Sequence, residues 1–248
     1  MGAFMLALAV EKWSLHRRIA LTVLSRTGTD GRKLILGFMI AASLLSMWMT
    51  NTSTAMMLLP IAASVAAMVA EKASGASAES KRTFQVALLL SLAYATTIGG
   101  MATIIGTPPN VLLAGFIEET YRLQIAFMDW MLIGLPLALI LLPLGWVVLT
   151  RIAFTVDIAE SKEAGDVITD MRRQLGVMHA SERRVGLLFL AVVFLWMTRS
   201  WLNDFSGLEG VSDAGIVMAA ALLLFVIPAG DGSGQRLMVW EDVSRLPW

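Results

Sequence analysis

A cluster of hydroxyl and amide side chains interrupts a long apolar segment in the first third of the chain. The segment 34–70 contains no charged residue, yet its middle carries Ser46, Thr50, Asn51 and Thr52. A polar group without a partner in hydrocarbon costs several kcal/mol. These side chains therefore require partners, which either neighbouring helices or a bound ligand must supply.

The order of these residues predicts two halves with opposite electrostatics. On a helix, Ser43, Ser46 and Thr50 share one face, and we expect them at the carboxyl end of a first helical arm, where free carbonyl groups favour a small cation. Residues 51–53 (Asn-Thr-Ser) are typical amino-terminal caps of a second arm, whose free N–H groups favour an anion. The cluster is thus predicted to combine a cation site with an anion site.

The composition is that of an integral membrane protein. The chain has 248 residues, of which 57% are hydrophobic and 15% charged, and its mean hydropathy is +0.72. Soluble domains carry about 25% charged residues. The formal net charge is zero, so no nucleic-acid partner is expected. The lack of cysteine excludes a disulfide framework, a thiolate metal site and a cysteine nucleophile.

The two histidines give little support for catalysis or metal binding. His16 and His179 both lie in charged stretches, where a histidine is more often a solvated loop residue than a ligand or a general base. We therefore expect both side chains to be solvated.

Alternating basic and apolar stretches predict an all-α, polytopic membrane protein, with the basic stretches in the cytoplasm. In chain order, we predict the end of a truncated transmembrane helix at 1–10, a cytoplasmic interfacial helix at 11–33, a re-entrant hairpin at 34–70, a cytoplasmic loop and a broken transmembrane helix at 71–116, a transmembrane helix at 129–150, a cytoplasmic segment at 151–184, two transmembrane helices at 185–229, and a loop leading to a missing helix at 230–248.

The hairpin follows from the length of the apolar segment 34–70. It is too long for one span of about 20 residues, and basic segments predicted to be cytoplasmic flank it on both sides. The chain must therefore enter the membrane and return, which puts the polar cluster at the tip.

The broken helix follows from glycine and proline pairs in the second apolar run. Gly99-Gly100 loosens a helix, and Pro108-Pro109 removes two backbone donors and disfavours helix before it. We predict a break at Gly99-Gly100, near the membrane centre. Broken backbone at that depth needs protein or a polar cavity to satisfy it.

The residue types favour sodium as the coupling ion. Segments 34–70 and 83–116 contain no Asp, Glu, Lys or Arg, whereas a proton relay usually needs an intramembrane carboxylate or histidine. Neutral hydroxyl, amide and carbonyl oxygens suit a hard alkali cation. Helix ends that face each other near the membrane centre are typical of ion-coupled secondary transporters.

Two motifs carry a resemblance to the divalent anion:sodium symporters, a family of sodium-coupled dicarboxylate, citrate and sulfate carriers. Residues 48–60 (Trp-Met-Thr-Asn-Thr-Ser-Thr-Ala-Met-Met-Leu-Leu-Pro) resemble the first Ser-Asn-Thr motif of that family. Residues 98–110 (Ile-Gly-Gly-Met-Ala-Thr-Ile-Ile-Gly-Thr-Pro-Pro-Asn) resemble the segment that follows the hairpin. Residues 15–21 resemble its interfacial helix, and 240–248 resemble the lead-in to a later helix.

The resemblance implies one half of an inverted-repeat elevator transporter, homodimeric when complete and embedded in the lipid bilayer of the plasma membrane. It implies an anion site at Thr50, Asn51, Thr52 and Gly100. It implies a sodium site at Ser46, Thr50, Asn51 and Gly99. No second Asn-Thr motif follows Pro109, so the other half of the site is expected from residues outside this sequence.

One position departs from the family pattern. Thr50 stands where the family usually has serine, so the hydroxyl is kept while a methyl group is added and the side chain is stiffened. This leaves the preferred substrate open.

The predicted function is sodium-coupled symport of di- or tricarboxylates (succinate, malate, fumarate, citrate) or of sulfate. A related carrier of arsenite, or of sodium and protons, is an alternative. An intramembrane enzyme is disfavoured, because the apolar segments lack a nucleophile–base pair and paired carboxylates. A structural subunit, in which the polar cluster only packs helices, is the third possibility.

Overall fold

The described part of the chain is almost entirely helical. The computed structural model describes residues 1–72, 77–157, 162–202, 210–230 and 234–244. Within these ranges the elements are helices, apart from an isolated antiparallel bridge between Pro228 and Arg236. The predicted all-α class is confirmed.

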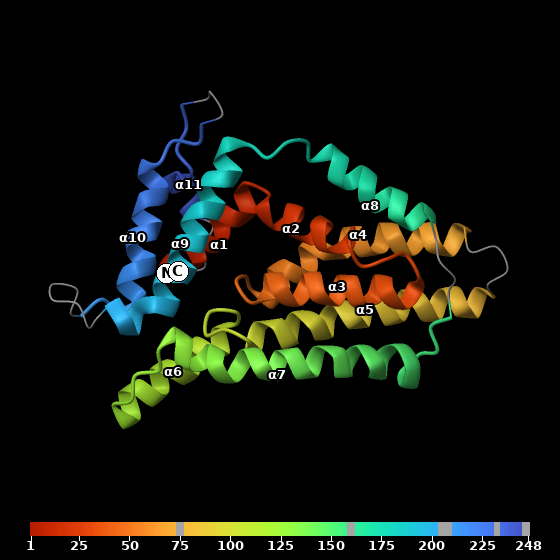
Figure 1. Cartoon of the computed structure of the whole chain (residues 1–248), viewed down its shortest axis with the longest axis horizontal. Helices are drawn as coiled ribbons and strands as arrows, with labels where there is room; N and C mark the ends of the chain where they lie inside the picture. The colour runs from red at the N-terminus through yellow and green to blue at the C-terminus, as the bar shows by residue number, and fades with distance from the viewer. Residues whose placement is uncertain (73–76, 158–161, 203–209, 231–233, 245–248) are drawn as a thin grey trace. The chain divides into compact units, whose positions relative to one another are not determined.

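The helices appear in Figure 1 with the labels used below. In chain order they are α1 (Gly2–Lys12), α2 (Leu15–Leu24), α3 (Gly31–Ser46), α4 (Asn51–Lys72), α5 (Ala78–Met101), α6 (Pro108–Tyr121), α7 (Phe127–Val147), a π-helical turn η1 (Val148–Ala153), α8 (Lys162–Gln174), α9 (Ala180–Leu202), α10 (Asp213–Val226) and α11 (Trp240–Val243). They form two compact units, one of residues 1–17, 126–129 and 177–248, the other of residues 18–125 and 130–176.

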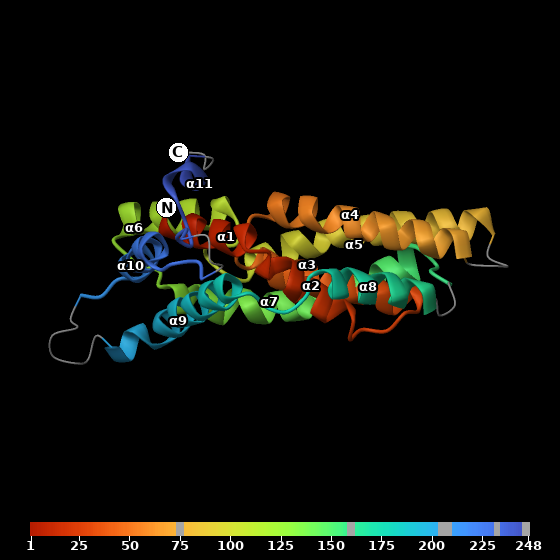
Figure 2. The same cartoon turned by 90° about the horizontal axis from the view of Figure 1, so that it is seen from above.

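Helices α3, α4 and α5 form the core of the larger unit. α3 packs against α5, and α4 packs against both, so the three lie side by side in Figures 1 and 2. Fully buried Phe38 and Met39 of α3 meet small residues such as Ala87 and Ala95 of α5 in one apolar cluster. The pairing of large with small side chains lets the helix axes approach closely.

Helix α7 is held to this core near both ends by tryptophan side chains. Near its start, Trp130 Nε1 donates a hydrogen bond of 3.0 Å to the carbonyl of Met101, at the end of α5. Near its other end, Trp146 Nε1 donates one of 2.9 Å to the carbonyl of Arg32, at the start of α3. α7 therefore runs antiparallel to α3 and α5.

The predicted position of the helix break is wrong. Gly99 and Gly100 lie in the last turn of α5, which continues to Met101, and the interruption spans residues 102–107. Pro108 and Pro109 occupy the first two positions of α6, where a missing N–H and a fixed φ are tolerated. The glycine pair serves a close helix contact, described below.

The predicted roles at the hairpin tip also need correction. α3 ends at Ser46, so Thr50 does not share a helical face with Ser43 and Ser46. Residues 51–53 form the first turn of α4, and the cap is Thr50, whose Oγ1 accepts the N–H of Ser53 at 3.2 Å. Thr50 takes the cap position because its hydroxyl lies directly before the first free N–H groups of α4.

Among the described residues, three helices are long and apolar enough to cross a membrane, namely α4, α5 and α7 with its continuation to Ala153. α3 has 16 residues, or about 24 Å at 1.5 Å per residue, which is short of a hydrocarbon core of about 30 Å. The re-entrant hairpin, the sidedness and the two spans at 185–229 stay predictions. The helix within the predicted interfacial segment 11–33 is α2, which is much shorter than that range.

The smaller unit is built from α1, α9, α10 and α11. α1 packs on α10 so closely that a Cβ on Gly2 would lie 2.8 Å from the Val217 carbonyl oxygen. Lys12 at the end of α1 forms a half-buried ion pair of 2.6 Å with Asp242 of α11. The predicted helices of this region are therefore joined by polar contacts at their ends as well as by apolar packing.

His16 is not the solvated residue that the sequence predicted. It is 5% exposed, and its Nδ1 lies 3.0 Å from the Val10 carbonyl oxygen. Because a carbonyl only accepts, Nδ1–H is the donor in this hydrogen bond. Burial lowers the pKa of His16 below its ordinary value, against the opposing effect of the hydrogen bond. His179 is exposed, as predicted.

This burial predicts a pH-dependent stability. Since the folded chain lowers the pKa of His16 below 6.5, the neutral form stabilises the fold above that pH, and stability falls as the pH drops below it. Lowering the pH from about 7.5 to about 5.5 should reduce Tm less in His16→Gln than in the native protein. His179→Gln is the control and should retain the native pH dependence. Equal pH dependence of Tm in all three proteins would contradict the assignment.

Two arginine–aspartate pairs allow a matched test of how burial affects the contribution of an ion pair to stability. Arg199–Asp213 and Arg173–Asp170 both have N–O distances of 3.4 Å, but the first is half-buried and the second exposed. Asp213 also accepts the N–H of Phe127 at 2.8 Å, and the ring of Phe127 stacks on Trp196. Asp213 therefore holds Phe127 within the smaller unit.

We expect Asp213→Ala to lower the free energy of unfolding by about 1–3 kcal/mol, because it leaves a half-buried N–H and guanidinium without their acceptor. Asp170→Ala should change it by less than about 0.5 kcal/mol, as for other solvated pairs. Thermal unfolding of both variants in detergent measures the difference. A similar loss of stability in the two variants would mean that burial does not strengthen the Arg199–Asp213 pair.

Candidate functional site

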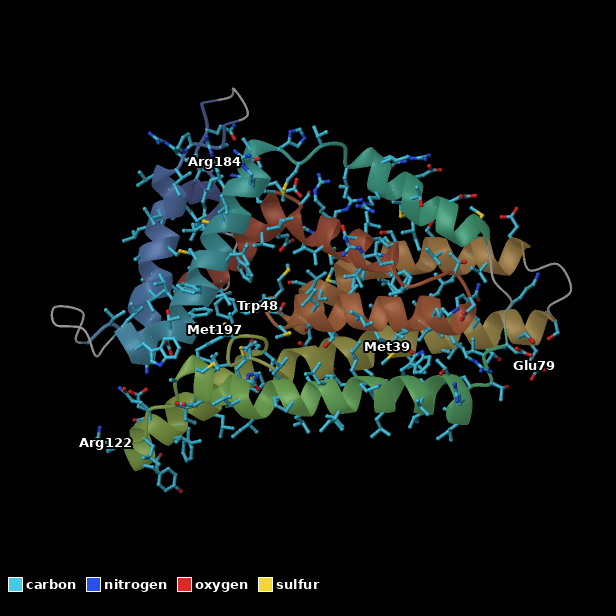
Figure 3. All side chains as sticks on the ribbon, in the orientation of Figure 1. Met39, Trp48, Glu79, Arg122, Arg184 and Met197 are labelled. Carbon is cyan, nitrogen blue, oxygen red and sulfur yellow. The ribbon has the colours of Figure 1, made fainter. Side chains whose placement is uncertain are left out.

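The turn at the hairpin tip and the break after α5 meet at one end of the larger unit. The turn consists of residues 47–50 and the break of residues 102–107. The fully buried Thr103 donates its hydroxyl hydrogen to the carbonyl of Met47. Figure 3 labels Trp48 at this end and Glu79 at the opposite end of α5. Two segments that are about fifty residues apart in sequence thus form one site.

Ser46 and Asn51 form the centre of this site. The hydroxyl of Ser46, which is fully buried, donates a hydrogen bond of 2.7 Å to Oδ1 of Asn51. A Cβ placed on Gly100 would lie 2.3 Å from the same Oδ1. The structure therefore brings three of the predicted residues together, one from each of the helices α3, α4 and α5.

Glycines allow the backbones at this point to approach each other. A Cβ on Gly99 would lie 2.2 Å from the carbonyl oxygen of Ser43, a backbone atom that cannot move aside. A Cβ on Gly106 would lie 2.6 Å from the carbonyl oxygen of Gly100 and 2.9 Å from that of Ser46. The carbonyls of Ser46 and Gly100 consequently converge on one small region.

Asn110 fixes one of these carbonyls, a role that the sequence did not reveal. It is 9% exposed, and its Nδ2 donates to the carbonyls of Gly100 at 2.9 Å and Thr103 at 2.8 Å. Both partners accept only, which settles the orientation of the amide. The position of an asparagine directly after Pro-Pro was the available signal, but its partners lie in the preceding helix and break.

The two threonines assigned to the anion, of which Thr50 was also assigned to sodium, take no part in the Ser46–Asn51 hydrogen bond. Thr50 caps α4, and its hydroxyl also donates to Ser53 Oγ at 2.9 Å. Thr52, in the first turn of α4, is exposed. These residues mark the amino terminus of α4, where unpaired N–H groups carry partial positive charge.

The amino terminus of α6 differs from that of α4. Pro108 and Pro109 have no N–H to offer, and the N–H of Asn110 bonds to the carbonyl of Thr107 at 3.1 Å. Of the two helices that begin here, α4 is therefore the better donor to an anion.

The atoms at this site that could coordinate a cation are neutral oxygens. A hydroxyl, an amide oxygen and two carbonyls gather where α3 and α5 end, and helix carboxyl ends carry partial negative charge. In the described ranges, no group of three or more His, Cys, Asp or Glu could hold a metal. Oxygen ligands of this kind suit a hard cation.

Comparison with known proteins gives a match along the whole chain. The family described as "Sodium:sulfate symporter transmembrane region" matches residues 1–248. A protein named "Sodium-dependent dicarboxylate transporter SdcS" from Staphylococcus saprophyticus is 38% identical over 251 residues, covering 100% of this chain and 48% of that protein. Its namesake from Staphylococcus aureus (strain USA300) is 34% identical with the same coverage. The chain spans about half the length of these relatives.

The glycine contacts predict a large difference between two alanine substitutions. Gly99→Ala should destabilise the larger unit by about 1–3 kcal/mol or more, because its Cβ would collide with the backbone of α3. Gly115→Ala in α6 is the control, since its Cβ would meet nothing within 4 Å and alanine favours helix by about 0.5–1 kcal/mol. Thermal unfolding should therefore show opposite changes in Tm. An unchanged Tm in Gly99→Ala would contradict the close contact.

Proposed function

The chain belongs to the sodium:sulfate symporter family, and on this premise we propose that it forms one half of a sodium-coupled carrier of di- or tricarboxylates in the plasma membrane. Apolar helices and family membership identify it as an integral membrane protein. The other half of the binding site would come from a second, inverted repeat, and the complete carrier would be a homodimer. The printed names of its relatives favour a dicarboxylate over sulfate.

The observation that carries the proposal is the hydrogen bond between Ser46 and Asn51 against Gly100. Sodium would lie beside this pair, with the Ser46 hydroxyl, the Asn51 amide oxygen and carbonyls at the ends of α3 and α5 as ligands. These groups are neutral, so the ion can leave as readily as it enters. A carrier needs such a balance between binding and release.

The anion would bind at the amino terminus of α4. Its free N–H groups, together with the side chains of Asn51 and Thr52, can receive one carboxylate. Thr50 contributes by capping this turn and so by fixing the direction of those N–H groups.

Asn51 would couple the two ligands. Its Oδ1 belongs to the cation half, while its own backbone begins the helix that receives the anion. An ion that holds the Asn51 side chain therefore also orders the first turn of α4. Sodium then raises the affinity for the anion, and by linkage the anion raises the affinity for sodium.

A purely structural role for the cluster is the second candidate, and one observation favours it. Ser46 and Asn51 already form a hydrogen bond with each other, so the pair could simply join α3 to α4. The two roles differ in their response to sodium, which the following experiment measures. Enzymatic activity is not expected, since the relatives are transporters.

We expect Asn51→Ala in the complete carrier to raise the sodium concentration for half-maximal uptake at least about tenfold, a loss of about 1.4 kcal/mol. Labelled succinate uptake into vesicles, with sodium replaced by choline as a reference, measures this, and competition by sulfate tests the substrate. Thr97→Ala is the control, because that exposed hydroxyl bonds to its own helix at Ala93. Native sodium dependence in Asn51→Ala would favour the structural role.

A further inference from the structure

Thr54, in the first turns of α4, has a hydroxyl with no partner. Its side chain is fully buried, and Oγ1 makes no hydrogen bond within the part of the chain that the structure describes. A buried hydroxyl without a partner costs about 1–3 kcal/mol. A buried hydroxyl of this kind calls for an explanation, and an ion or water outside the folded chain is one.

Thr54 does not make the hydrogen bond that other helical threonines of this chain make to their own helix. Thr150, Thr198 and Thr97 each donate to the carbonyl four residues earlier, at 2.7, 2.8 and 3.2 Å. Thr54 has such a carbonyl available, because its own N–H bonds to Thr50 at 3.0 Å in regular helical geometry. Its hydroxyl nevertheless makes no bond there.

The position of Thr54 relates it to the cation half of the site. It follows Asn51 by three residues, so the two side chains share one face of α4. Side chains on a helix lean toward its amino terminus, and Thr54 therefore leans toward the turn that holds Asn51. Asn51 in turn lies against Gly100 and bonds to Ser46.

We propose that the Thr54 hydroxyl is a further oxygen ligand of the cation site, adjacent to Ser46 and Asn51, and that sodium satisfies it on binding. This inference rests on the proposed function. The side chain is fully buried, so packing limits its rotation before the ion arrives. Its unpaired state in the ion-free chain increases the affinity for the ion, since binding removes the cost of the buried hydroxyl.

Ser91 provides a matched control within the same core. It is also fully buried, and its Oγ is also without a partner. It lies on α5 nine residues before Gly100, about 13 Å along the helix axis. If an unpaired hydroxyl had only a stability effect, replacement of Ser91 and of Thr54 would have the same consequence.

The test is sodium binding by the complete carrier, purified in detergent and followed as the rise in Tm with NaCl against choline chloride. Thr54→Val, which keeps the shape, should have an equal or higher Tm without sodium, and its half-saturating sodium concentration should rise about tenfold. Thr54→Ser should bind sodium as the native protein does. Ser91→Ala should keep native sodium binding. Should Thr54→Val not fold, Thr54→Ala is measured in the same way.

The possible outcomes separate this inference from the proposed function. Native sodium binding in the Thr54 variant, together with lost binding in Asn51→Ala, would overturn the role of Thr54 alone. Sodium binding weakened as much in Ser91→Ala as in Thr54→Val would also overturn it. The effect would then follow from the loss of any buried hydroxyl in this core. No rise in Tm with sodium in the native carrier would overturn both the inference and the proposed function.

Discussion

The backbone contact between α3 and α5 is the constraint on which the site depends. Gly99 lies so close to the Ser43 carbonyl that a single methyl group cannot be inserted between them. This contact brings two helix carboxyl ends together, and it leaves room for Asn51 against Gly100. It also permits the break after α5 to reach the hairpin turn, where Thr103 and Met47 bond. Small residues that allow such approach are typical of helix packing in membranes.

The sequence predicted the all-α class and the residues Ser46, Asn51 and Gly100 that the fold brings together. It could do so because charge-free length and clustered polar side chains are local properties. The break was misplaced because the same glycine pair can either loosen a helix or accommodate a neighbouring helix. The second use depends on a tertiary contact, which a local pattern does not contain.

The errors at Thr50 and His16 have related causes. Helix boundaries carry an uncertainty of one or two residues, and a shift of one residue moved the cap from Asn51 to Thr50. Charged neighbours suggested that His16 is solvated, but its ring is buried and bonds to the carbonyl of Val10 in α1. The partners of Asn110 likewise lie in a different element. Sequence proximity predicted which side chains lie close together better than it predicted their hydrogen-bond partners.

The proline pair that begins α6 also affects the field at the cation half. A helix amino terminus normally presents the positive end of its dipole through unpaired N–H groups, and this repels cations. Here the first two positions have no hydrogen to present, and the third is already bonded to Thr107. α6 can therefore start beside the convergent carbonyls with much of that repulsion removed. A pair of prolines that disfavours helix before it thus removes two hydrogen-bond donors from the amino terminus of α6.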